Sequence, residues 1–209
     1  MYMGMTSNRD NYLCGIGDKY YIRRKPALTA FAEQWEYDPI IMALKALDIN
    51  TGKYLEIGCS DGWRLKAINE NIGMSCYGVE PSLTAIENAK YGCIQRGTAD
   101  KLDFGSNLFE VVAFGFCLYL CDNEDLFKIA SEADRVVTDD GYIVIYDFIV
   151  DGIVYRPNPD CPSMQTRKMD CGKMFEWHPS YTQIYKRWHR PVYDTNSVDV
   201  CVNVFKKKG

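Results

Sequence analysis

The sequence predicts an α/β fold in which a doubly wound, mostly parallel seven-stranded sheet ends in an antiparallel hairpin, and three observations support this prediction. From residue 53 to residue 149, short apolar runs alternate with amphipathic helical patterns, as in successive β-α units. The run at 109–116 is apolar except for Glu110, as expected of a strand that helices cover on both faces. Too few residues separate the final runs, 181–188 and 198–204, for a helical crossover, so this pair should be antiparallel.

Local signals predict the individual elements in chain order. Pro26 and Pro39 each come before apolar residues at helical spacing, so each should open a helix ahead of the sheet. Further helices should begin near Gly62, Pro81 and Asp122, between successive strands. The strands are expected, in order, at 53–57, 75–80, 92–95, 109–116, 142–149, 181–188 and 198–204.

Length and charge limit the classes of protein that fit. A chain of 209 residues is long enough for one domain with a substantial core and short for two. Lys and Arg number 24 against 28 Asp and Glu, and the largest basic block is the triplet at 206–208. Nucleic-acid-binding proteins usually have a basic face, so we expect no nucleic-acid partner. No apolar run reaches the roughly 18 residues of a membrane span, so we expect no membrane insertion.

Cysteine usage indicates reduced thiols rather than a disulfide framework. The nine cysteines are an odd number, and residues 1–10 are too polar for a signal peptide. No Cys-x-x-Cys pair occurs, and Cys117 and Cys121 have no second pair to complete a zinc site. We therefore expect a reduced, cytoplasmic, soluble protein without a bound metal.

The segment YLEIGCSDGW, residues 54–63, has an unusual pattern at the end of the first strand. Glu56 places a charge inside an apolar run, and Gly58 and Gly62 then bracket three small or polar residues. A glycine-rich turn lets a ligand approach the backbone where a Cβ would clash, and the following helix offers free N–H groups. A second acid, Glu80, closes the next strand. The carboxyl ends of these strands are therefore the predicted ligand site.

The chain resembles the class I S-adenosylmethionine-dependent methyltransferases through five motifs in order. Their first motif is matched by Glu56, Gly58 and Gly62, the acid closing strand two by Glu80, and the aspartate after strand three by Asp100. The hydrophobic strand four appears as VVAFGFCLYL, and the helix-turn-strand that follows as ADRVVTDDGYIVIYDF. The resemblance covers about residues 38–150.

This resemblance implies a division of the chain and a strand order. The methyltransferase domain would span 38–209 with the strand order 3-2-1-4-5-7-6. Residues 1–37 would form an amino-terminal arm that covers the donor and acceptor, and 151–180 an insert over the acceptor. A homodimer is compatible with this organisation.

The resemblance also implies which residues bind the donor, S-adenosylmethionine. Glu80 would accept hydrogen bonds from both ribose hydroxyls, Asp100 with the Ala99 backbone would bind the adenine edge, and Glu56 would hold the amino-acid end. The adenine ring would lie between Leu118 and Pro81 or Ser82, and two carbonyls after strand four would face the ammonium. The full set is Glu56, Gly58, Cys59, Ser60, Gly62, Glu80, Pro81, Ser82, Ala99, Asp100, Gly115, Phe116 and Leu118.

Methyl transfer from a sulfonium is an in-line displacement, so holding the acceptor in position can provide most of the acceleration. The expected acceptor is a small molecule, with a sugar or sugar nucleotide as one candidate. A hydroxyl acceptor would also need a base, for which His178, Asp147 and Tyr119 are the candidates. A nitrogen acceptor would need none.

Two other functions remain open from the sequence. An NAD-dependent oxidoreductase also has a glycine turn followed by an acid about 20 residues later, but Ser60 stands where its second glycine would be. A non-catalytic subunit that binds S-adenosylmethionine as a sensor would have the same motifs. Each acid also has an ordinary structural interpretation, such as a helix cap for Asp100. The sequence would lack a donor site only if these structural interpretations were all correct at once.

Overall fold

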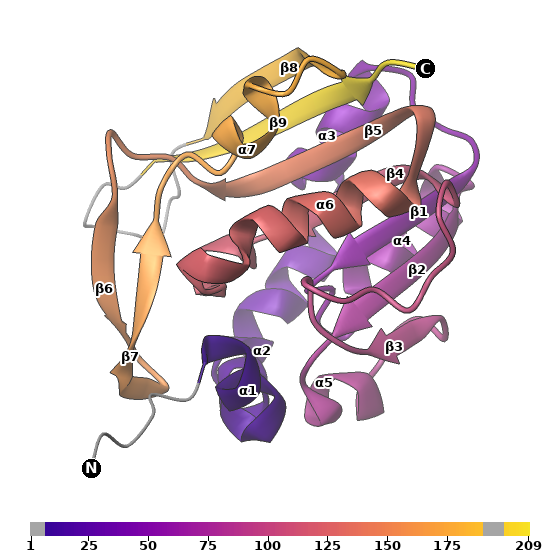
Figure 1. The fold of residues 1–209 in the computed structure, drawn as a ribbon. Helices are drawn as coiled ribbons and strands as arrows, with labels where there is room; N and C mark the ends of the chain where they lie inside the picture. Colours follow the sequence, from indigo (N-terminus) through magenta and orange to yellow (C-terminus); the bar gives the residue numbers. More distant parts are fainter. Residues whose placement is uncertain (1–6, 190–198) are drawn as a thin grey trace.

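The seven-stranded sheet is present in the computed structural model, which describes residues 7–189 and 199–209 (Figure 1). Its order is β3-β2-β1-β4-β5-β9-β8, with the first five strands parallel and β9 antiparallel to both of its neighbours. Counted within this sheet alone, the order is 3-2-1-4-5-7-6, as predicted. The strands are β1 (Lys53–Ile57), β2 (Ser75–Glu80), β3 (Ile94–Arg96), β4 (Phe109–Gly115), β5 (Val137–Phe148), β8 (Tyr181–His189) and β9 (Val200–Lys207). The predicted strand start at Val198 lies outside the described residues.

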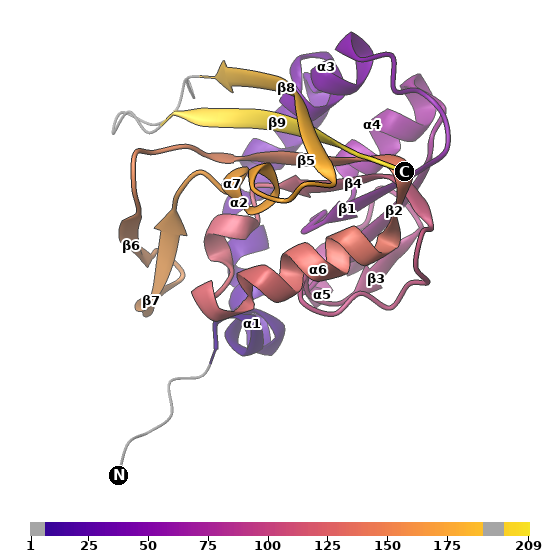
Figure 2. The ribbon, with the colours of Figure 1, turned by 45° about the horizontal axis from the view of Figure 1, so that its top comes forward.

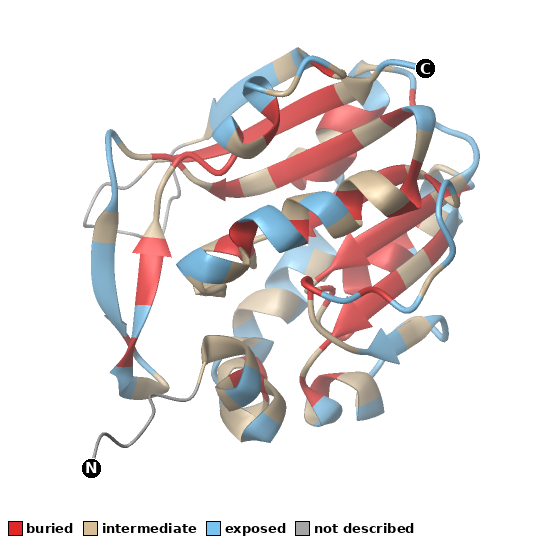
Figure 3. Ribbon diagram, in the orientation of Figure 1, coloured by how far each residue is buried: buried red, intermediate tan, exposed pale blue. Residues whose placement is uncertain are grey.

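Helices cover both faces of the sheet, which explains the continuous apolar runs (Figure 2). On one face α3 (Pro39–Ala46) and α4 (Trp63–Asn71) pack over side chains such as Tyr54 and Val111. On the other, α6 (Leu126–Val136) and α7 (Lys173–Glu176) pack over Leu55 and Val112. Successive strand residues therefore enter opposite hydrophobic clusters, and most residues of the central strands β1 and β4 are buried (Figure 3).

The amino-terminal arm is more helical than predicted. It consists of α1 (Asn8–Asn11), a π-helical turn (Tyr12–Ile16) and α2 (Gly17–Glu33). The predicted helix start at Pro26 is wrong, because Pro26 lies inside α2. Contacts distant in sequence hold the turns before it: Asp18 accepts hydrogen bonds from Ser82 Oγ at 2.6 Å and from Thr84 N at 2.9 Å. Local propensity does not contain these contacts.

The insert contains a two-stranded hairpin that the sequence analysis missed. Strands β6 (Val154–Asn158) and β7 (Cys161–Lys168) pair antiparallel and stand apart from the main sheet (Figure 1). Three residue pairs join the hairpin to the amino-terminal helices, one of them through Asn8 Nδ2, which donates to Gln165 O at 3.2 Å. Asn158 Nδ2 donates to Tyr12 Oη at 3.1 Å, and Arg23 forms two 2.8 Å hydrogen bonds with Asp160. The two segments predicted to cover the site therefore contact each other.

The start of α6 also differs from the prediction. A 3₁₀ turn (Asn123–Asp125) precedes the helix, and the side chain of Asp122 makes no capping hydrogen bond. Asp122 instead accepts a long hydrogen bond, 3.4 Å, from the backbone N–H of Arg9 in α1. The residue therefore contacts the amino-terminal arm rather than capping α6.

Candidate active site

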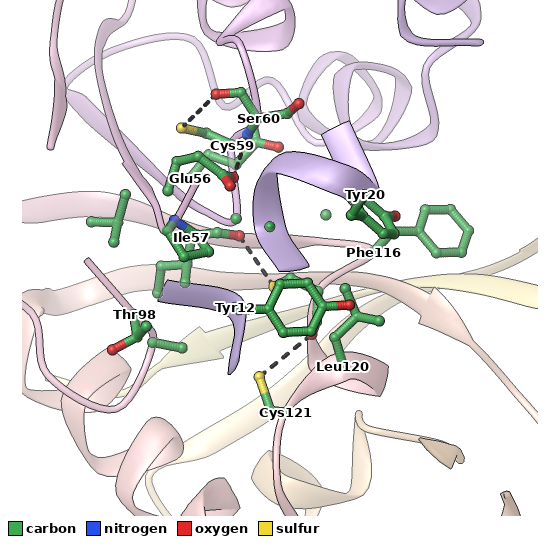
Figure 4. A pocket seen from close by; sticks show the side chains of 18 of the residues that line it. Tyr12, Tyr20, Glu56, Ile57, Cys59, Ser60, Thr98, Phe116, Leu120 and Cys121 are labelled. Atoms are coloured by element: carbon green, nitrogen blue, oxygen red, sulfur yellow. Dashed lines mark hydrogen bonds between the residues drawn. The ribbon is translucent and has the colours of Figure 1, made fainter. Parts of the chain in front are cut away.

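A cavity lies at the carboxyl ends of β1, β2 and β4, covered by α1, α2 and the turn between them (Figure 4). This is the edge of a parallel sheet where ligands of α/β proteins bind. Most of the predicted donor-binding residues line it: Glu56, Gly58, Cys59, Ser60, Glu80, Pro81, Ala99, Asp100, Gly115 and Phe116. The fold thus gathers residues from four separate sequence motifs around one space.

The glycines of this cavity leave backbone exposed where a side chain would not fit. Gly58 has φ +75°, and a Cβ built on it would lie 2.6 Å from Cys117 Cβ. A Cβ on Gly115 would lie 2.7 Å from Arg64 Nη1 and 2.9 Å from Glu56 Oε1. All three distances are shorter than real Cβ contacts allow. The cavity wall at these two positions is therefore bare main chain.

Three predicted donor residues do not line the cavity. Ser82 is buried and its hydroxyl is engaged, because it accepts from Ala85 N at the start of α5 (Leu83–Glu87) and donates to Asp18. Leu118 is fully buried in the core cluster beneath α6. Gly62 has φ +72° and begins α4, and a Cβ there would lie 2.8 Å from Ile94 Cδ1. These residues shape the turns around the site instead of facing it.

Glu80 is held by backbone groups and keeps acceptor capacity. Its Oε2 accepts from Ser60 N at 2.8 Å and its Oε1 from Ser82 N at 2.9 Å. Burial raises the pKa of Glu80 to about 7, and the two backbone hydrogen bonds oppose that rise. Each carboxylate oxygen has a second lone pair, so a pair of hydroxyls can still donate to it. The Ser60 N–H, which would face a pyrophosphate in a dinucleotide site, is directed to Glu80 instead.

Glu56 is buried with one oxygen unpaired. Arg64 donates to both oxygens of Asp38, at 3.0 Å each. It also donates to Glu56 Oε1. Glu56 Oε2 is buried and has no hydrogen-bond partner among the residues that the structure describes. Burial raises the pKa of Glu56 to about 7, and the Arg64 contact opposes that rise. A buried unpaired carboxylate oxygen is costly unless a ligand satisfies it, so this oxygen suits an ammonium.

Asp100 sits at the other end of the cavity beneath α1. Its Oδ2 accepts from Arg9 Nη1 at 2.9 Å and from Lys128 Nζ at 3.2 Å. Burial raises the pKa of this carboxyl, but hydrogen bonds from Thr98, Arg9 and Lys128 outweigh it, so the pKa lies below its usual value. Asp100 therefore stays ionised and links the amino-terminal arm to the loop after β3.

None of the three candidate bases lines the cavity. His178 follows α7, which packs on α6 and β8; its Nδ1 accepts from Ser180 N at 3.3 Å and its ring packs on Tyr181. Asp147 is buried and accepts from Phe148 N at 2.8 Å and Tyr119 N at 3.2 Å. Burial raises the pKa of Asp147 to about 7. The geometry gives these two residues packing and turn-holding contacts instead of contact with a ligand.

Tyr119 reaches the cavity only through another tyrosine. Its hydroxyl lies 3.2 Å from the hydroxyl of Tyr20, which does line the cavity. Burial raises the pKa of both phenols, so neither is an effective proton acceptor near neutral pH. This hydroxyl pair can orient a polar group of a ligand.

One face of α2 supplies lining residues that the sequence analysis did not assign to the donor. Tyr20, Arg24, Leu28 and Phe31 occupy positions spaced by four, four and three, so they project from one side of the helix. The spacing was readable in the sequence. It was missed because the helix was expected to begin at Pro26, which left Tyr20 and Arg24 outside it.

The described residues contain no group of three or more His, Cys, Asp or Glu arranged to hold a metal ion. Within the same residues, no helix combines the length and apolar character needed to cross a membrane.

The fold and the site together define a class of protein. A seven-stranded sheet with this order, bare backbone after β1, an acid closing β2 and an unpaired buried carboxylate fit a nucleoside that carries an amino acid. Residues 55–145 match the family model described as a methyltransferase domain. This match and the fold together identify a class I S-adenosylmethionine-dependent methyltransferase domain in the chain, as the sequence motifs predicted.

Solved structures share this fold at low sequence identity. A 1,6-didemethyltoxoflavin N1-methyltransferase from Burkholderia thailandensis, with S-adenosylhomocysteine bound, is 14% identical, with a TM-score of 0.72 over 100% of this chain and 94% of that chain. An S-adenosylmethionine-dependent methyltransferase from Methanosarcina mazei is 17% identical, with a TM-score of 0.59 over 75% and 92% of the two chains. A protein of echinomycin biosynthesis is 19% identical, with a TM-score of 0.61 over 81% of each chain. No curated protein matches the sequence significantly.

Proposed function

We propose that this methyltransferase acts on a small molecule bound between the amino-terminal helices and the carboxyl ends of β4 and β5. The observation that carries the donor half of the proposal is the unpaired Glu56 Oε2 beside the bare backbone of Gly58 and Gly115. When bound, S-adenosylmethionine supplies a methyl group already activated on a sulfonium. The chain's own residues bind and orient the reactants and keep water out.

The donor's three parts correspond to three groups of residues. Glu80 accepts hydrogen bonds from the ribose hydroxyls through its remaining lone pairs. Asp100, with the Ala99 backbone, binds the adenine edge beneath α1, and Glu56 Oε2 accepts from the ammonium. Arg64 acts through Glu56: it holds one carboxylate oxygen so that the other stays directed at the ligand.

The lining of the cavity favours an acceptor that needs no base. Among the described residues no histidine or lysine lines it, and its carboxylates are engaged with neighbours or suited to the donor. Aromatic side chains, including Tyr12, Tyr20 and Phe116, supply flat apolar walls (Figure 4). A ring nitrogen or a group already ionised at neutral pH fits this environment, because its lone pair is available without proton removal.

A planar heteroaromatic acceptor is therefore our first candidate. The Burkholderia methyltransferase, which covers the whole of this chain, binds 1,6-didemethyltoxoflavin, and that is support by similarity of fold. A sugar or sugar nucleotide, expected from the sequence, is the second candidate; its hydroxyl would require a base, and for that reason it ranks lower. A homodimer stays a prediction.

Two measurements test the proposal. Calorimetric titration with S-adenosylhomocysteine and with NADH, side by side, should give binding of the first alone; binding of NADH alone would contradict it. Transfer of a labelled methyl group is then measured with 1,6-didemethyltoxoflavin, simple phenols and sugar nucleotides. Transfer to the heterocycle supports the first candidate, and transfer to sugar nucleotides alone supports the second. Binding without transfer to any small molecule, including a cell extract's small-molecule fraction, supports a sensor.

A further inference from the structure

Arg24 is a cation in the cavity with no assigned role. We propose that its guanidinium binds the carboxylate of the donor's methionine moiety, an inference that rests on the proposed function. An arginine of the amino-terminal arm can also pair with a phosphate or carboxylate group of an acceptor. The contacts of the other cavity arginines, and the position of Arg24 along α2, point to the donor instead.

The charges around the cavity single out Arg24. Three arginines line it. Arg9 is paired with Asp100 at 2.9 Å, and Arg64 is paired with Asp38 and Glu56. The Arg24 side chain forms no hydrogen bond or ion pair with any residue in 7–189 or 199–209. It is therefore the cavity cation whose charge is free to meet an anion.

The contacts of α2 place Arg24 near the glycine turn. At the start of the helix, Gly17 lies against Ser82, where a Cβ would be 3.3 Å from Ser82 Cβ, so this end of α2 is beside the turn after β2. One turn later Tyr21 Oη donates to Asp61 Oδ2 at 3.4 Å. Near the other end, the Phe31 ring lies 6.4 Å from the Trp63 ring.

Arg24 lies between these last two contacts in the sequence of α2 and faces the cavity. Asp61 and Trp63 bracket the end of the glycine turn, whose first part is next to Glu56. The guanidinium is thus on the side of the cavity where the amino-acid end of the donor is expected, and not beside Asp100.

Electrostatics require a cation at this end. The cavity lining includes the carboxyls of Glu56, Glu80 and Asp100, and a donor carboxylate buried among them without a partner would be strongly disfavoured. Glu56 Oε2 satisfies only the ammonium. Arg24 supplies the opposite charge, and a guanidinium can bind a carboxylate through two parallel hydrogen bonds.

The test compares two donors that differ only in this carboxylate. Binding of S-adenosylmethionine and of decarboxylated S-adenosylmethionine is measured by calorimetry with wild type, Arg24→Ala and Arg24→Lys. Wild type should bind the decarboxylated compound at least about tenfold more weakly, since a hydrogen bond to a charged group is worth that much. Arg24→Ala should lose about the same factor for S-adenosylmethionine and change little for the decarboxylated compound. Arg24→Lys should recover part of the loss.

Arg23→Ala is the matched control. Arg23 precedes Arg24 in α2 and pairs with Asp160 of the hairpin, and it does not line the cavity. Its loss removes the same charge and should change the affinity for both compounds by the same factor. Circular dichroism establishes that each variant is folded, and Arg24→Met serves as a second variant that keeps the apolar stem.

Each outcome separates the inference from the proposed function. If wild type binds neither compound, the proposed function is wrong. If wild type binds both equally, no cation holds the carboxylate and the inference is wrong while the function stands. If Arg24→Ala weakens both compounds alike, or neither, Arg24 does not act on the carboxylate. Loss of acceptor affinity with donor affinity intact would place Arg24 in the acceptor site and overturn the inference.

Discussion

Replacing Gly58 by alanine tests whether the turn after β1 needs bare backbone. Gly58 has φ +75°, and its N–H donates to Val79 O at 2.8 Å. This hydrogen bond to β2 holds the backbone of the turn in place. A Cβ there would approach Cys117 Cβ to 2.6 Å and Cys117 Sγ to 3.2 Å. Cys117 itself is held, because its thiol donates to Ile57 O at 3.2 Å. The new methyl group therefore fits only if Cys117 or the turn backbone moves.

Two contributions lower the free energy of unfolding of Gly58→Ala. The left-handed backbone conformation costs an L-residue about 1–2 kcal/mol, and forcing a methyl into a packed site costs about 1–3 kcal/mol more. The expected loss in the free energy of unfolding is about 2–5 kcal/mol. Affinity for S-adenosylhomocysteine should also fall, because the methyl group or the displaced Cys117 enters the donor's space.

Gly73→Ala is the matched control for this experiment. Gly73 also has a positive φ, +93°, but a Cβ there would meet nothing within 4 Å. It should lose only the conformational part, about 1–2 kcal/mol, and bind S-adenosylhomocysteine as wild type does. Any change in the unfolded chain is shared by both variants. Urea unfolding and calorimetry measure the two quantities; equal stability losses and equal affinities in the two variants would refute the steric argument.

Four further predictions concern the carboxylates and the histidine. Glu80→Gln should weaken S-adenosylhomocysteine binding by about tenfold or more in calorimetry, since charge-assisted hydrogen bonds are lost. Because burial raises the pKa of Glu80 from 4.5 to about 7, wild-type affinity should increase between about pH 6 and pH 8. The folded state binds the extra proton, so this group's contribution to the free energy of unfolding falls as pH rises from 4.5 to 7, and urea unfolding of Glu80→Gln should show a weaker dependence. Asp147→Asn and His178→Ala should leave donor affinity and methyl transfer within about twofold of wild type, because neither side chain lines the cavity; a hundredfold loss of transfer with normal folding would make that residue catalytic.

Most of the residues that line the cavity at the carboxyl ends of the strands were predictable, because their signals are local in the sequence. Glu56 and Glu80 stand at the ends of apolar strand patterns, and parallel strands bring their carboxyl ends to one edge of a sheet. Asp100 follows the third strand in the same way. The glycine turn could likewise be read without coordinates, since only a residue without Cβ suits Gly58.

The positions of the candidate bases could not be predicted from local sequence patterns, and none of the three lines the cavity. His178 was selected because of its residue type and its place in the insert, and neither property fixes where a side chain points. In the structure α7 packs on α6 and β8, so His178 contacts Tyr181. The missed hairpin has a similar cause: β6 and β7 are largely exposed on one side and lack the apolar alternation of a core strand.

By itself the sequence determined the order of the strands, the class of donor and the acids that line the cavity, because these depend on residue patterns within single β-α units. Tertiary structure alone decided which charges remain free. Arg64 is neutralised by Asp38, 26 residues away, and Tyr12 is tied to Asn158, 146 residues away. Such pairings follow from how the finished chain packs, and they leave Glu56 Oε2 and the Arg24 guanidinium without a partner among residues 7–189 and 199–209.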